Sequence, residues 1–156
     1  MTSVPPSHRD PYDLDRFVLA QESVYDRALT ELRAGHKQTH WMWFIFPQCA
    51  GLGFTTMNIR YSITSRAEAT AYLAHPMLGP RLRDAATASM RVAGRSAREI
   101  FDHDARKLHS SATLFDSIEP ATVFDRLLEH FFDGVRDAAT VKWLDASPDE
   151  KSIGGF

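Results

Sequence analysis

One short stretch, residues 37–48, combines aromatic and polar side chains of the kinds that line small-molecule pockets. Four of its residues carry this signal: His40, Trp41, Trp43 and Gln48. Ligand pockets are mostly apolar with a few convergent polar groups, and this stretch has that composition. We therefore take these four as candidate ligand-binding residues. The alternative is that the aromatic run serves only as hydrophobic core.

A second polar set, Lys107, Ser110 and Ser111, falls at helical spacing further along the chain. Lys107 and Ser111 are four residues apart, so their side chains can meet on one helix face. A desolvated lysine can act as a base toward a serine hydroxyl. Because the Gly-x-Ser-x-Gly turn of many hydrolases is missing, a polar lining for phosphate or ribose is the better interpretation. The alternative is a surface lysine beside serines that bond within their own helix.

Arg60 and Tyr61 come after the glycine-rich segment Gly51–Gly53 and extend the candidate site by a cation and a phenol. The segment lacks the Lys-Ser/Thr pair of a P-loop and the third glycine of a dinucleotide-binding turn. We expect a tight turn that leads into a short helix. Arg60 and Tyr61 either bind an anion there or simply pack.

Metal binding and thiol chemistry find little support. His36 and His40 have the spacing of two metal ligands on a helix, but no carboxylate or third histidine occurs at a matching interval. We predict no metal and no other cofactor. Cys49 is the single cysteine, which excludes an intramolecular disulfide, and no activating base for it is identifiable.

The elements that position these residues are predicted to be helices, because apolar residues recur every three or four positions. The first helix is expected from an Asp13 cap to Gly35, with the polar Gln21 on its apolar face in need of a buried partner or a ligand. Capping boxes open helices at Ser65 and Ser96. Further helices are expected at about 78–92, from an Asp104 cap to Ile118, from Pro120 to Gly134, and after an Asp137 cap.

The aromatic run Trp41–Phe46 is the one segment whose residues favour a strand, but no partner strand is evident. We expect a short buried helix or an extended plug. The fold class is therefore all-α: a compact single-domain bundle of about six to eight helices with an aromatic-rich central segment.

Length, composition and charge set the wider frame. The chain has 156 residues, of which 44% are hydrophobic and 24% charged, as in one globular domain. We expect a disordered tail at 1–10, the domain at 11–146 and a flexible tail at 147–156. The net charge of −2 gives no basic field for nucleic acid. With no signal-peptide core and no membrane-length apolar run, a cytoplasmic location is expected.

Four motifs resemble the uncharacterised bacterial family known as domain of unknown function 1810, sometimes labelled calpastatin-like. They are Asp10-Pro11-Tyr12-Asp13-Leu14-x-x-Phe17, His40 to Gln48 with Gly51-Leu52-Gly53, Ala71-Tyr72-Leu73-x-His75-Pro76-x-Leu78-Gly79-x-Arg81-Leu82, and Lys107-Leu108-x-Ser110-Ser111-x-Thr113-Leu114-Phe115. The resemblance implies a compact all-α domain and no known activity. Two residues depart from it: Cys49 replaces the usual Leu, and Ala112 replaces an expected Met, a change that would reshape a pocket wall.

A fainter likeness links the chain to YbiA-like helical domains, which are associated with ADP-ribose and N-glycosidic chemistry. It rests on size, helical character and the Lys107–Ser111 stretch ahead of a Phe-rich helix. Our first hypothesis is a site for an ADP-ribose-type or other nucleotide-derived small molecule, with N-glycosidic hydrolysis as the reaction class and a carboxylate or His40 as general base. The second is a non-catalytic protein-interaction or adaptor domain whose aromatic motif is only core.

Overall fold

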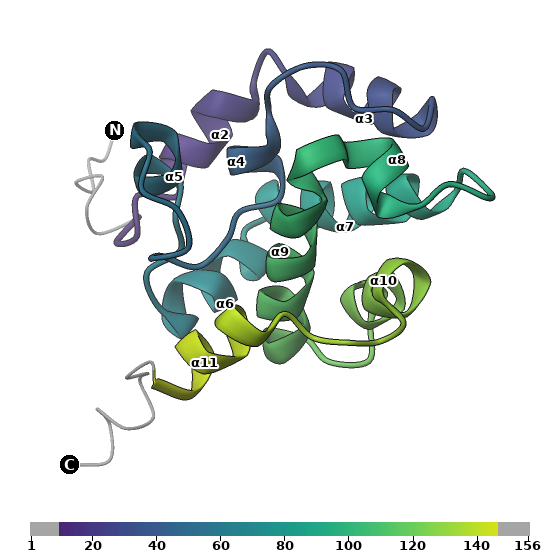
Figure 1. Cartoon of the computed structure of the whole chain (residues 1–156). Coiled ribbons are helices and arrows are strands. Elements are labelled where there is room, and N and C mark those ends of the chain that lie inside the picture. Colours follow the sequence, from purple (N-terminus) through teal and green to yellow (C-terminus); the bar gives the residue numbers. More distant parts are fainter. Residues whose placement is uncertain (1–9, 147–156) are drawn as a thin grey trace.

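A computed structural model describes residues 10–146, and within that range the chain forms helices joined by loops (Figure 1). In chain order they are α2 (Asp15–Gln21), α3 (Tyr25–Arg33), α4 (Met42–Ile45), α5 (Thr56–Arg60), α6 (Arg66–Ala74), α7 (Leu78–Met90), α8 (Ala97–Phe101), the 3-10 helix η1 (Asp102–Asp104), α9 (Ala105–Ile118), α10 (Val123–Phe132) and α11 (Ala138–Ala146). The β pairing in this range is a single bridge between Cys49 and Ile63. The predicted compact all-α fold is confirmed. Apart from Asp10, both predicted tails lie outside the described residues.

α9 runs through the middle of the molecule and contacts α6, α8, α10 and α11 (Figure 1). A helix surrounded in this way buries side chains on nearly every face, and all residues from Ser110 to Asp116 are buried. Several of these residues are polar, so each needs a partner inside the protein. None of the described helices is long and apolar enough to cross a membrane.

The aromatic run forms the short helix α4 with buried flanks, which confirms the expected short buried helix. Trp41 and Phe46 are almost completely buried, and their rings lie 6.4 Å apart between centroids. Phe101 from α8 meets both rings edge-on. Edge-to-face pairs of this kind stabilise a core beyond the area that they bury. The run therefore joins α4 to α8 across the core.

The predicted helix from Asp13 to Gly35 is wrong in extent, because the chain forms two helices, α2 and α3, in its place. The break comes after Gln21, whose amide enters the core and donates to the Phe44 carbonyl at 2.7 Å. The N–H of Val24 then bonds to the Gln21 carbonyl three residues earlier, a tighter turn than an α-helix allows. Gly35 ends α3 in the left-handed region, as predicted.

Gln21 has the buried partners that the sequence required. Its Nε2 also lies 3.2 Å from the Tyr72 hydroxyl, and its Oε1 accepts from Arg81 at 3.2 Å. The amide is therefore satisfied by the protein itself. It fixes α2 against α4 and α7, and no ligand is needed to explain it.

Three predicted helix starts are corrected by the structure. Asp10, not Asp13, accepts the first N–H groups of α2, and Asp13 itself has a φ of +51°. Asp104 caps nothing with its side chain, because its carboxylate pairs with two lysines instead. α10 begins at Val123 rather than at Pro120, because Ala121 has a φ of +61° and cannot continue a right-handed helix.

Other predicted starts are confirmed. Ser96 forms a complete capping box at α8. At α6 the Ser65 hydroxyl accepts from the Glu68 N–H at 3.0 Å. The Glu68 carboxylate pairs with Arg16 instead of completing a capping box. Asp137 caps α11, accepting from the Thr140 N–H at 3.0 Å.

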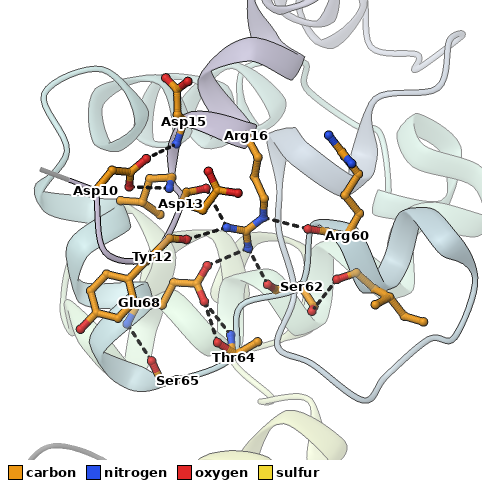
Figure 2. Close-up of polar contacts among 12 residues, drawn as sticks. Asp10, Tyr12, Asp13, Asp15, Arg16, Arg60, Ser62, Thr64, Ser65 and Glu68 are labelled. Carbon is orange, nitrogen blue, oxygen red and sulfur yellow. Dashed lines mark hydrogen bonds and ion pairs between the residues drawn. The ribbon is translucent and has the colours of Figure 1, made fainter. Parts of the chain in front are cut away.

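The guanidinium of Arg16 ties the start of the domain to the loop between α5 and α6 (Figure 2). It donates to five oxygens at 2.7–2.9 Å: the carbonyls of Tyr12, Asp13, Arg60 and Ser62 and the carboxylate of Glu68. A planar fork of five donors suits such an arrangement, and lysine cannot reproduce it. The loop that Arg16 holds also lines a cavity on the surface of the domain.

Candidate functional site

Two adjoining cavities lie between the Trp43–Thr64 segment and the first turns of α9 and α11. The first, termed the aromatic cavity, has a volume of about 310 Å³ and is lined chiefly by Trp43, Cys49, Phe54, Ile59, Tyr61 and Thr64. The second, the polar cavity, has a volume of about 350 Å³ and is lined chiefly by Leu52, His103, Arg106, Lys107, Ser110 and Asp137. Both share Gln48, Gly53 and Asn58, so these three residues form the junction.

Gln48 connects the junction to α9. Its Nε2 donates to the Ser110 hydroxyl at 2.6 Å, and that hydroxyl lies 3.2 Å from the Lys107 carbonyl within the same helix. The pairing brings together two residues that the sequence predicts as binding residues and that stand 62 positions apart. Within residues 10–146 no donor bonds to the side-chain oxygen of Gln48, so this atom can accept a hydrogen bond at the junction.

Lys107 links the chemistry of the two cavities. Its Nζ lies 5.5 Å from the centroid of the Trp43 ring, within the range of a cation–π contact. The same Nζ is 3.1 Å from Asp104 Oδ1. The Lys107 cation of the polar cavity therefore stands beside the Trp43 ring of the aromatic cavity. A ligand that carries an anionic group close to a flat ring could contact both side chains at once.

Asp104 positions Lys107 from behind. Its other oxygen pairs with Lys37 at 2.9 Å, and Lys37 in turn lies 5.0 Å over the Trp41 ring. Burial alone would raise the pKa of Asp104, but hydrogen bonds from the two lysines outweigh it and hold that pKa below its usual value. The carboxylate is therefore charged at neutral pH, so one carboxylate orders two cations.

Two further side chains with nitrogen donors and one carboxylate complete the polar cavity. His103 comes from η1, and Arg106 comes from the first turn of α9 beside Lys107. Asp137 is the acid among them, and its Oδ2 is held by the Thr140 N–H and hydroxyl. The backbone N–H of Asp137 donates to the Thr113 hydroxyl at 2.9 Å, which anchors it to α9.

Cys49 lines the aromatic cavity but is not an activated nucleophile. Burial raises the pKa of its thiol to about 12, and the neighbouring Thr140 hydroxyl only partly offsets this effect. A thiol with that pKa stays protonated at neutral pH and reacts slowly. Of the two departures from the family pattern, Cys49 is the one on a cavity wall. Ala112 is buried in the core and lines neither of these two cavities, so the change from Met leaves their walls as they are.

The structure brings five predicted site residues to the two cavities: Trp43, Gln48, Tyr61, Lys107 and Ser110. The other four lie apart from them. His40 is exposed, and Trp41 is buried with its indole N–H donating to Glu31 at 2.8 Å. Arg60 is exposed beside Tyr61. Ser111 is buried, and within residues 10–146 its hydroxyl has no hydrogen-bond partner.

Sequence reasoning missed several residues that line the cavities: Asn58, Phe54, Ile59, His103, Arg106 and Asp137. One signal was available in the sequence at Gly53, because a glycine in or beside a turn often marks a place where another group packs closely against the backbone. A Cβ built on it would lie 2.4 Å from Asn58 Nδ2. Gly53 therefore lets the Asn58 side chain into the junction.

Metal binding finds no support in the structure. Within the part of the chain that it describes, no three His, Cys, Asp or Glu side chains gather as metal ligands. His36, one member of the histidine pair in the sequence, faces Asp102 at 3.7 Å on the surface instead.

The fold and the site together define a small all-α domain with a divided cavity, aromatic on one side and cationic on the other. Residues 11–144 match the family described as "Protein of unknown function (DUF1810)", and the chain belongs to this family. Its structure is similar to the crystal structure of the conserved hypothetical protein Rv1873 from Mycobacterium tuberculosis. The TM-score is 0.86 at 48% sequence identity, covering 88% of this chain and 100% of that one. The comparison with curated proteins gave no match.

Proposed function

We propose that the two cavities bind a nucleotide-derived small molecule of the ADP-ribose type. One observation carries the proposal: the Lys107 ammonium stands 5.5 Å from the Trp43 ring, where the aromatic and polar cavities meet. Trp43 and Tyr61 offer a base the aromatic surface on which it can stack. Lys107 and Arg106 offer phosphate oxygens charge-assisted hydrogen bonds.

The size of the site supports a ligand of this class. Each cavity alone reaches the roughly 300 Å³ at which small-molecule pockets begin. The shared Gln48 and Asn58 supply amide donors and acceptors at the junction. Should the ligand be turned over, N-glycosidic hydrolysis is the reaction to assay, with a carboxylate as general base. His40, the alternative base, lies outside both cavities.

Lys107→Met is the variant that tests the proposal most directly. Methionine keeps an apolar stem against Trp43 and removes the charge, so we expect affinity for ADP-ribose to fall at least about tenfold. Stability should fall by less than about 1 kcal/mol, because the Lys107–Asp104 pair is partly exposed and Asp104 keeps Lys37. Isothermal titration with ADP-ribose measures the first effect and urea unfolding the second.

Lys142→Met is the matched control, because Lys142 is exposed on α11 and lines neither cavity. It removes the same charge and should leave ADP-ribose affinity unchanged. If Lys107→Met binds ADP-ribose as tightly as the unaltered protein does, the proposed site is wrong.

The second candidate function is protein interaction, and two exposed apolar side chains favour it. Phe54 is 80% exposed and Ile59 is 61% exposed, and both stand at the rim of the aromatic cavity. A thermal-shift screen with ADP-ribose, NAD and nucleotides separates the candidates. Ligand at a hundred times its dissociation constant stabilises a protein by about 2.7 kcal/mol, which shifts the midpoint of a domain this size by several degrees. A flat screen favours the interaction domain.

A further inference from the structure

Lys37 is a cation that lines neither cavity but is joined to Lys107 through a shared carboxylate. The Nζ of Lys37 lies 2.9 Å from Asp104 Oδ2, and the Nζ of Lys107 lies 3.1 Å from Asp104 Oδ1. Only 8% of the Lys37 side chain is exposed, against 27% of the Lys107 side chain. A buried cation thus stands one carboxylate away from a cation of the polar cavity.

The position of Lys37 is fixed from two sides. Its backbone N–H donates to the Ile100 carbonyl at 2.7 Å, which attaches it to the last turn of α8. Its Nζ lies 5.0 Å from the centroid of the Trp41 ring, and the indole N–H of that ring donates to Glu31 at 2.8 Å. The Lys37 ammonium therefore stays with Asp104.

The three charged groups add up to one positive charge, because two lysines share one carboxylate. Each lysine contacts a different oxygen of Asp104, so the carboxylate neutralises Lys107 only in part. Removal of the Lys37 charge leaves both oxygens for Lys107 and brings the sum to zero. Lys107 is the more exposed partner, so it is the one that can move from the Trp43 ring toward the second oxygen.

We propose that Lys37 is a positioning residue of the site. By sharing Asp104, it keeps the Lys107 ammonium beside Trp43 and leaves the positive charge of Lys107 available to an anionic ligand. The inference rests on the proposed function and deepens it, because it states what determines the affinity of the site for the phosphate groups of a nucleotide. A neutral nucleoside, which offers only its base and its sugar, does not respond to this charge.

Lys37→Met tests the inference with ADP and adenosine as the two probes. Methionine keeps an apolar chain against the Trp41 ring and removes the charge. We expect ADP affinity, measured by isothermal titration, to fall about tenfold. Adenosine affinity, measured by competition with ADP, should stay within about twofold of that of the unaltered protein, because adenosine carries no charge. A purely structural role of Lys37 would lower both affinities together.

A second replacement restores the sum of charges without restoring Lys37. Asp104→Asn in the Lys37→Met background leaves Lys107 as the one charged group of the three, and the asparagine oxygen can still accept from it. ADP affinity should therefore recover to within about threefold of that of the unaltered protein. Thermal midpoints verify that both variants fold.

Lys142→Met is the matched control, because it removes an equal charge from an exposed position of α11 outside both cavities. It should leave the ratio of ADP affinity to adenosine affinity unchanged.

The outcomes separate this inference from the proposed function. If Lys37→Met leaves that ratio unchanged, or if Asp104→Asn does not restore ADP affinity, Lys37 does not control the charge of Lys107, while the nucleotide site stands. If the unaltered protein binds neither ADP-ribose nor ADP, the proposed function fails and this inference fails with it.

Discussion

Glu31→Gln is expected to lower the free energy of unfolding by about 2 kcal/mol at pH 7. Glu31 is 8% exposed, and its Oε1 accepts from the N–H groups of Gln38 and Thr39 and from the Trp41 indole, all at 2.8–3.0 Å. Glutamine keeps an oxygen for these donors but loses the charge that strengthens each bond. Glu31→Ala leaves the donors without a partner in the core and should cost about twice as much.

The same contacts predict how stability depends on pH. Burial would raise the pKa of Glu31, but hydrogen bonds from Gln38, Thr39 and Trp41 outweigh it and lower that pKa to about 2. Because the folded value lies below the unfolded value of 4.5, the stabilisation is fully present above pH 4.5 and is lost as pH falls toward 2. The difference corresponds to about 3 kcal/mol. Glu31→Gln should therefore lose its disadvantage as the solution is acidified.

Urea unfolding at pH 7, 4.5 and 3 measures both effects. Glu22→Gln is the matched control, because Glu22 is exposed at the end of α2 and has no side-chain role in the core. It should unfold like the unaltered protein at pH 7. A Glu31→Gln variant that keeps the stability of the unaltered protein at pH 7 would show that the Glu31 carboxylate does not fix the segment after α3.

The all-α class can be predicted from local pattern, because helical periodicity and caps such as Ser96 depend on residues close in sequence. The break between α2 and α3 cannot. It depends on Gln21 reaching Phe44, 23 positions away, and tertiary contacts of that kind override local periodicity. The same limit explains Asp104, whose neighbours suggest a cap but whose carboxylate is drawn to Lys37 across the fold.

Only those residues of the candidate site whose types stand out in the sequence could be predicted. Trp43, Gln48 and Lys107 stand in unusual patterns, and all three line the cavities. Trp41 stands in the same pattern, yet its indole turns to Glu31, because neighbouring residues on a short helix point in different directions. Asp137 has an ordinary local explanation as a cap, which hides its place in the wall of the polar cavity. Only the packing of α11 on α9 brings it into the polar cavity.

Arg16→Met is expected to destabilise the protein by about 3–5 kcal/mol. The variant leaves the Glu68 carboxylate, whose side chain is 3% exposed, without its opposite charge. It also leaves four backbone carbonyls without the guanidinium donors (Figure 2). Arg16→Lys restores the charge but not the planar fork, so it should recover only part of the loss.

A double replacement separates the ion pair from the backbone contacts. Glu68 keeps hydrogen bonds from the Thr64 N–H and hydroxyl at 2.9 Å, so Glu68→Gln in the Arg16→Met background should recover part of the lost stability. Arg27→Met, at an exposed position of α3, is the control and should stay within about 0.5 kcal/mol of the unaltered protein. If Arg16→Met lowers the free energy of unfolding no more than the control does, the guanidinium does not hold the start of the domain against the loop between α5 and α6.

The same variant connects the stability of the fold to the site. Arg16 bonds to the carbonyls of Arg60 and Ser62, and Tyr61 and Ser62 line the aromatic cavity. Without the guanidinium this wall loses its anchor, so ADP-ribose affinity should fall in Arg16→Met although Arg16 lines neither cavity. Arg16→Lys should fall between the two proteins in affinity as it does in stability. Isothermal titration at a temperature where each variant is folded makes the comparison. Unchanged ADP-ribose affinity in a destabilised variant would show that the Arg16 bonds do not determine the shape of the aromatic cavity.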